Sequence, residues 1–126
     1  MERIETTIIR NLIHNEDFSR KVIPFLEPTY FERRSEKILF EEISSFIVKY
    51  GSAVTIEALN IEVENRSDVT DDEVKEIKEI NQYLNDSPVD QQWLFDVTEK
   101  WCRDRAIYLA LMAVSYTHLR AHETTD

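Results

Sequence analysis

The feature that most constrains this chain is a long segment of helical pattern that begins near Pro88 and reaches no clear stop signal. Its first half mixes apolar side chains such as Trp93 and Trp101 with charged ones, whereas residues 106–112 are almost wholly apolar. A helix that is apolar all round must be covered by protein along that part. Because no later segment of the sequence could cover it, the pattern predicts a domain that is cut off halfway through a helix-to-helix interface.

Glycine and proline are scarce, with one Gly and three Pro among 126 residues. This composition disfavours a turn-rich β fold and favours helices joined by short polar connections. We therefore expect an all-α fold, in which a small globule of about five short helices is followed by one long helix. A phosphate-binding loop of the P-loop or dinucleotide type needs two or three glycines, so the lone Gly51 excludes both in this chain.

Apolar residues at helical spacing, together with capping signals, place the expected helices. The last of them opens at Ser87 and Pro88, a cap followed by proline at the first helical position. The other expected caps are Asn15, Gly51, Thr55 and the capping box of Thr70 with Glu73. The expected helices cover residues 2–14, a short stretch around 18–23, and residues 35–50, 56–63, 71–84 and 88–113.

The chain is strongly acidic, with 15 basic and 25 acidic residues and a net charge of −10. Nucleic acid repels such a domain unless a basic patch intervenes. Two basic clusters exist, but carboxylates interleave both of them, so we expect solvated or protein-facing surfaces. The clusters are Arg33, Arg34 and Lys37, and Lys100, Arg103 and Arg105.

The sequence also indicates where the chain resides. Cys102 is the only cysteine, so no intrachain disulfide can form and a reducing compartment is expected. The N-terminus lacks the apolar region of a signal peptide, and no run approaches the roughly 18 apolar residues of a membrane span. We therefore expect a cytoplasmic protein with no membrane partner.

No residue pattern predicts a catalytic, cofactor-binding or metal-binding site. The basic neighbours of Cys102 could lower the pKa of its thiol, but no histidine is near in sequence to act as a base, which favours an inert thiol on a helix face. His14 lies where the first helix is expected to end, and a positive charge on its imidazole would stabilise that end through the helix dipole. His118 and His122 share a helical face, but two ligands are too few for zinc.

The carboxylates around Asp71 have a simple structural interpretation. A general acid–base pair or a hard-metal site could use such groups. The capping box and the solvent-facing side of one helix explain the same residues without any ligand. These residues are Asp71, Asp72, Glu73, Glu76 and Glu79.

Residues 114–126 differ in character from the apolar helix before them. The text VSYTHLRAHETTD closely resembles a tail found on unrelated reading frames translated through sequencing-adapter DNA. We therefore expect this segment to be non-native. Without it the net charge would be −9, so the interpretation of the charge is unchanged.

Three blocks of sequence resemble the N-terminal domain of DnaB-type replicative DNA helicases, especially the branch in large tailed phages. The resemblance covers about residues 2–112. The last block, around the R-x-R-A type sequence of residues 103–106, is the most specific. The blocks read IIRNLIHNEDFSRKVIPFLEPTYFERRSEKILFEEI, TIEALNIEVEN and SPVDQQWLFDVTEKWCRDRA.

This resemblance implies a domain organisation and a function. Residues 1–86 would be the globular head and residues 87–113 the first arm of a hairpin. In the family, hairpins pair between subunits and build a collar on a hexameric ring, where primase and, in some systems, a helicase loader dock. The parent protein would unwind DNA in the bacterial host cell with ATP or another NTP and Mg²⁺, through a motor domain outside this chain.

The aromatic residues of the long helix are assigned to two roles. Trp93 is expected in the core, whereas Trp101 is expected at the interface between subunits, so that Trp101→Ala would weaken assembly without unfolding the head. The alternative function is a standalone acidic helical adaptor or inhibitor that binds a host protein; a small helical enzyme would need a polar constellation that the sequence lacks. The expected interface residues are Trp101, Arg105, Tyr108, Leu109 and Met112.

Overall fold

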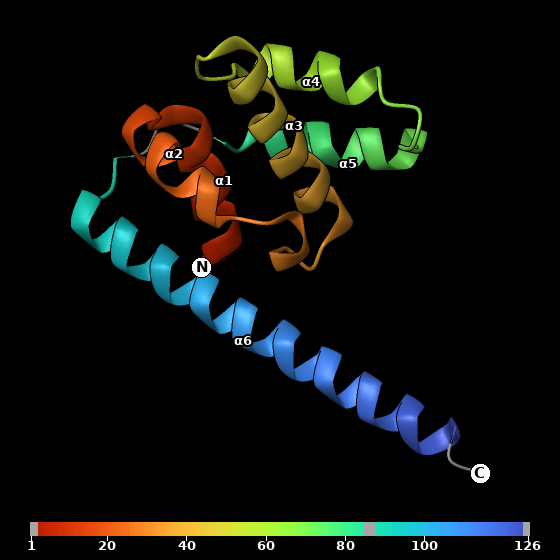
Figure 1. Cartoon of the computed structure of the whole chain (residues 1–126). Coiled ribbons are helices and arrows are strands. Elements are labelled where there is room, and N and C mark those ends of the chain that lie inside the picture. The colour runs from red at the N-terminus through yellow and green to blue at the C-terminus, as the bar shows by residue number, and fades with distance from the viewer. Residues whose placement is uncertain (1–2, 85–87, 125–126) are drawn as a thin grey trace.

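The computed structural model describes the backbone of residues 3–84 and 88–124, and side chains up to Ser115. All regular structure in these residues is helical, as predicted (Figure 1). The helices are α1 (Ile4–His14), α2 (Glu16–Val22), the 3-10 turns η1 (Ile23–Phe25) and η2 (Pro28–Tyr30), α3 (Arg34–Tyr50), α4 (Ile56–Glu64), α5 (Asp71–Gln82) and α6 (Gln91–Thr124).

Local capping chemistry explains where several helices begin and end. The backbone N–H of Phe18 donates to Asn15 Oδ1 at 3.1 Å and starts α2. Thr70 and Glu73 form the complete capping box that opens α5. Gly51 ends α3 at a φ of 67°, a left-handed conformation that glycine adopts without strain. These predicted caps are confirmed, as is the cap of α4 at Thr55.

One prediction about a helix end is wrong. The helix α6 begins at Gln91, where Asp90 Oδ2 accepts the N–H of Trp93 at 2.8 Å; Pro88 precedes the helix and Ser87 lies outside the described residues. His14 lies in the last turn of α1, as expected, and its Nε2 donates to the carbonyl oxygen of Leu84 at 2.9 Å. A tertiary contact therefore uses this imidazole to tie the end of α1 to the segment after α5.

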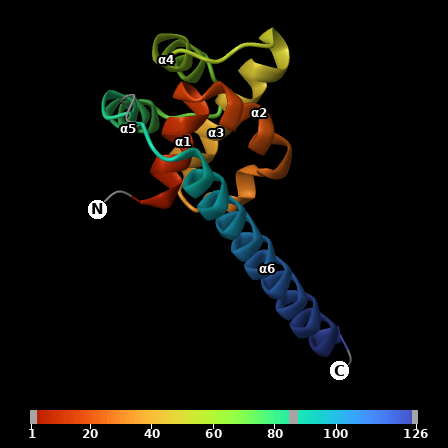
Figure 2. The ribbon, with the colours of Figure 1, turned by 90° about the vertical axis from the view of Figure 1, so that its left-hand side faces the viewer.

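The core of the globule forms where α1, α2 and α3 meet, with α4 and α5 packed on α3 (Figures 1 and 2). Large apolar side chains with no exposed surface fill it, and burial of each contributes about 1.5–3 kcal/mol. They include Ile8, Leu12, Phe18, Phe31, Leu39, Ile43, Leu59, Ile77 and Leu94.

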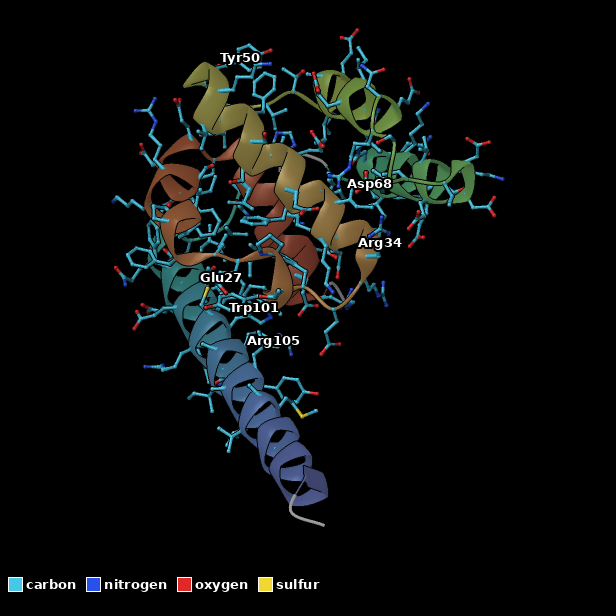
Figure 3. All side chains as sticks on the ribbon, turned by 45° about the vertical axis from the view of Figure 1, so that its right-hand side comes forward. Glu27, Arg34, Tyr50, Asp68, Trp101 and Arg105 are labelled. Atoms are coloured by element: carbon cyan, nitrogen blue, oxygen red, sulfur yellow. The ribbon has the colours of Figure 1, made fainter. Side chains whose placement is uncertain are left out.

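The ion pairs of the globule join its outer elements. Arg66 follows α4 and pairs with two carboxylates of α3, Glu41 at 3.3 Å and Glu42 at 3.1 Å. It also pairs with Asp68 of its own loop at 2.7 Å. The hydrogen bond from Arg66 lowers the pKa of Asp68 to about 2. Arg34 reaches toward Asp68 and pairs with Glu73 at 2.6 Å (Figure 3). Pairing with carboxylates confirms the expectation that Arg34 belongs to a mixed-charge surface.

The helix α6 has two parts. Leu94, Thr98 and Trp101 are buried against the globule, so the start of α6 belongs to the same core as residues 3–84. Beyond Arg105 the helix leaves the globule and extends away from it (Figure 3). We call residues 3–84 together with 91–105 the head, and residues 106–115 the stalk. The predicted boundary at residue 87 lies outside the described residues, and the core includes residues on both sides of it.

Candidate assembly surface on the stalk of α6

The stalk presents apolar side chains to solvent. Residues 106–115 contain no charged residue. Most of their large side chains are about half or more exposed, with 62% for Leu111 and 52% for Met112. Ile107, Tyr108 and Val114 are exposed in the same way. A continuous uncharged and apolar surface of this kind marks a place where protein packs on protein.

The physical consequence is a driving force for association. Covering the stalk with a second helix would remove several hundred Å² of apolar surface from water. At about 25 cal/mol per Å² this provides several kcal/mol before the cost of association. The interface predictions for Tyr108, Leu109 and Met112 concern this surface and stay predictions.

Trp101 lies at the root of the stalk and is a core residue (Figure 3). Its ring centroid is 5.0 Å from that of Phe31 and 6.0 Å from that of Tyr30. Its indole Nε1 donates to Glu5 Oε1 at 3.1 Å, and only 9% of the residue is exposed. Trp101 was expected at the interface between subunits, and in the structure it is instead part of the core of its own chain.

Trp93 shows the opposite error, because it was expected in the core and is 47% exposed. Eight residues separate it from Trp101, which is about 80° of rotation on a helix with roughly 100° per residue. The two indoles therefore point in different directions. The face that meets the head is instead marked by Leu94, Thr98, Trp101 and Arg105, at helical spacing.

Arg105 fastens the stalk to the head. Its Nε donates to the carbonyl oxygen of Tyr30 at 2.6 Å, and its Nη1 contacts Glu32 at 3.2 Å. The guanidinium also lies 5.1 Å from the centroid of the Tyr108 ring. These contacts fasten the stalk within the chain, and the expected place of Arg105 at the subunit interface stays a prediction. Arg105 holds the direction in which α6 leaves the head.

A partly buried polar cluster of Arg3, Glu5 and Glu36 also supports the joint between the stalk and the head, through Trp101. Arg3 pairs with Glu5 and with Glu36, each at 2.7 Å, and Glu5 accepts the hydrogen bond from Trp101. Glu36 is 4% exposed, and its Oε1 has no hydrogen-bond partner among the described residues. Burial raises the pKa of the Glu36 carboxyl, and the charge of Arg3 only partly offsets this effect.

We expect the free energy of unfolding of the Glu36→Gln variant to rise relative to that of the unchanged chain as the pH increases from 4 to 7. A carboxyl whose pKa is higher in the folded state than in the unfolded state favours folding at low pH. That contribution is lost as the pH rises from the ordinary value of 4.5 through the raised pKa. Urea unfolding at both pH values measures the difference, with Glu57→Gln on α4 as a control. A variant that loses more stability at pH 7 than at pH 4 would show that attraction to Arg3 dominates.

The remaining candidate residues are accounted for structurally. Burial raises the pKa of the Cys102 thiol to about 11, which is opposite in direction to the lowered pKa considered for it and favours an inert thiol. Glu73 belongs to the capping box of α5, and no group of His, Cys, Asp or Glu within the described residues could hold a metal ion. The side chains of His118 and His122 lie outside the described residues.

The second basic cluster is also paired with carboxylates. Lys100 contacts Asp104 at 3.2 Å, and Arg103 approaches Glu99 at 4.0 Å, each one turn away on α6. This confirms a mixed-charge surface.

None of the helices within residues 3–84 and 88–124 combines the length and hydropathy needed to cross a bilayer.

Comparison with known proteins connects this architecture to one relative. No protein-family model matches the chain. The chain is 37% identical over 103 residues to the DnaB-like replicative helicase of Enterobacteria phage T4. The aligned region is 82% of this chain but 22% of the length of that relative.

Proposed function

We propose that this chain is the N-terminal collar domain of a DnaB-like replicative helicase, because 82% of it aligns at 37% identity with the DnaB-like replicative helicase of Enterobacteria phage T4. In this role it mediates assembly of subunits into a hexameric ring and docks primase and a helicase loader during DNA replication. The proposal depends above all on the uncharged, exposed stalk, which is an unpaired helix surface joined rigidly to a folded head.

The arrangement of the joint supports this role. Trp101 and Arg105 fix the first four turns of α6 on the head, so the stalk extends at a defined angle. An assembly arm with a fixed angle places each neighbouring subunit at the same relative orientation, which a closed ring requires. A flexible tether would not provide this geometry.

The unwinding activity of the proposed whole protein would lie outside this chain. Gly51 is the only glycine and caps α3, so these residues offer no P-loop for ATP or another NTP with Mg²⁺. DNA would be bound by the motor domain of the longer protein, in the cytoplasm of the bacterial host. The alternative of a standalone adaptor is not favoured, because the similarity to one replicative helicase extends over 82% of the chain.

Sedimentation of the longer protein tests the proposal directly. Deleting residues 1–115 is expected to convert a ring of six subunits into smaller species and to slow DNA unwinding, while NTP hydrolysis by the separated motor persists at a lower rate. Replacing these residues with an unrelated helical domain of similar size provides the control. A deleted protein that still forms the complete ring would contradict the collar role.

A further inference from the structure

An open groove runs along the head on a face of α6 different from the one that carries Trp101. Its volume is about 710 Å³, and it extends along α6 from Gln92 to Ala106. At 1.5 Å per residue this stretch is roughly 21 Å long, the length of a helix of about 14 residues. Its apolar lining comes from α2, η1, η2 and α6: Val22, Phe25, Tyr30, Phe95, Cys102 and Ala106.

The groove is open to solvent at an aromatic side chain. Phe25 of η1 is 72% exposed, although it belongs to a residue type that is usually buried. The 3-10 turn holds this ring at one wall while Phe95 forms part of the other. An exposed aromatic side chain beside an apolar groove is the kind of anchor that dominates protein interfaces.

Two cations, Lys21 and Arg103, and one carboxylate, Glu99, line the groove, so its charged lining is net positive although the chain as a whole is acidic. Lys21 has no carboxylate partner among the described residues, and its Nζ lies 5.1 Å from the centroid of the Phe95 ring. Arg103 reaches only Glu99, at 4.0 Å with both side chains largely exposed. By contrast, Arg34 and Arg66 have carboxylate partners within 3 Å. The groove therefore offers positive charge that is nearly free to bind an acidic group.

We infer that this groove is a docking site for an amphipathic α-helix of a partner protein, with carboxylates beside its apolar face. The apolar side chains of the partner contact Phe25 and Phe95, and its carboxylates pair with Lys21 and Arg103. The stalk of a second copy is a poorer occupant, because residues 106–115 carry no carboxylate. The inference extends the proposed docking role but does not depend on how subunits assemble.

Binding of synthetic helical peptides to the whole chain, measured by fluorescence anisotropy, tests this inference. The acidic probe is a 16-residue peptide with leucines along one face and glutamates beside them; the basic probe has lysines in place of the glutamates. The acidic probe is expected to bind at least tenfold more tightly than the basic one. Lys21→Glu with Arg103→Glu is expected to reverse that preference, and Phe25→Ser to weaken both probes at least fivefold.

The matched control is Lys49→Glu with Lys75→Glu, which makes the same change in charge at exposed sites outside the groove. The inference is overturned if this control reverses the preference equally, or if neither probe binds. Tighter binding of a peptide of residues 102–115 would assign the groove to a second copy and also overturn it. Sedimentation of the longer protein separates the two proposals, because failed assembly of that protein with an unchanged probe preference of this chain counts only against the collar role.

Discussion

Trp101→Ala is expected to lower the free energy of unfolding of the head by about 3–5 kcal/mol, as for other large aromatic residues removed from a core. The substitution removes the ring that packs on Phe31 and Tyr30 and leaves a cavity between α6 and the head. It also removes the indole N–H that donates to Glu5. Denaturant unfolding followed by circular dichroism measures the loss.

Trp93→Ala is the matched control, because it makes the same chemical change on the same helix at a residue that is 47% exposed. We expect a loss of less than about 1 kcal/mol there, as for most surface substitutions. If Trp101→Ala instead left the stability unchanged and weakened only assembly, the core role of this residue would be refuted. The role first assigned to it, an anchor for a neighbouring subunit, would then be restored.

Leu109→Asp with Met112→Asp is expected to weaken association of the longer protein by a factor of 100 or more and to leave the stability of the head unchanged. Burying two unpaired carboxylates in an apolar interface costs several kcal/mol, whereas the same side chains are well hydrated on an isolated stalk. Sedimentation velocity over a range of protein concentrations measures the association, and thermal unfolding measures the stability.

The control for this variant is Val48→Asp with Ile61→Asp, which changes two exposed apolar residues of the head, on α3 and α4. These residues are 79% and 49% exposed, whereas Met112 of the stalk is 52% exposed and Leu109 is half-buried. Assembly that is equally weak in the control would show a general effect of added negative charge. Assembly that persists in the stalk variant would remove the support for the collar role.

Local chemistry explains why much of the fold could be predicted from the sequence. The caps at Asn15, Thr55 and Thr70 depend on side chains within three residues of the helix start, and the cap at Gly51 depends on its own backbone freedom. Apolar residues at helical spacing likewise mark a buried face wherever the helix is long enough. These signals need no knowledge of how distant segments meet.

Contacts between distant segments explain what could not be predicted. The hydrogen bond of His14 to Leu84 and that of Trp101 to Glu5 join residues 70 and 96 positions apart. Trp93 was expected in the core and is exposed, whereas Trp101 was expected at an interface and is buried, because eight residues along a helix turn the second side chain by about 80°. The helical spacing of Leu94, Thr98 and Trp101 marks the buried face of α6 correctly. The residue type alone does not mark it, because tryptophan suits a core and an interface equally.

The groove beside α6 was not predicted for a related reason. Its walls come from α2, η1, η2 and α6, and the sequence shows only that Phe25 follows a proline and that Lys21 ends a short helix. The stalk could be predicted, since ten consecutive residues without charge are visible in the sequence itself.

Site-specific crosslinking tests most directly whether the stalk is a surface between subunits. Leu111→Cys is prepared in a Cys102→Ala background, so that the protein domain carries one accessible thiol, and the assembled protein is treated with a short bismaleimide. Val48→Cys on the head, with similar exposure, is the control. We predict efficient crosslinking between subunits at residue 111 and little at residue 48. Equal or absent crosslinking at residue 111 in a protein that is otherwise assembled would contradict the account.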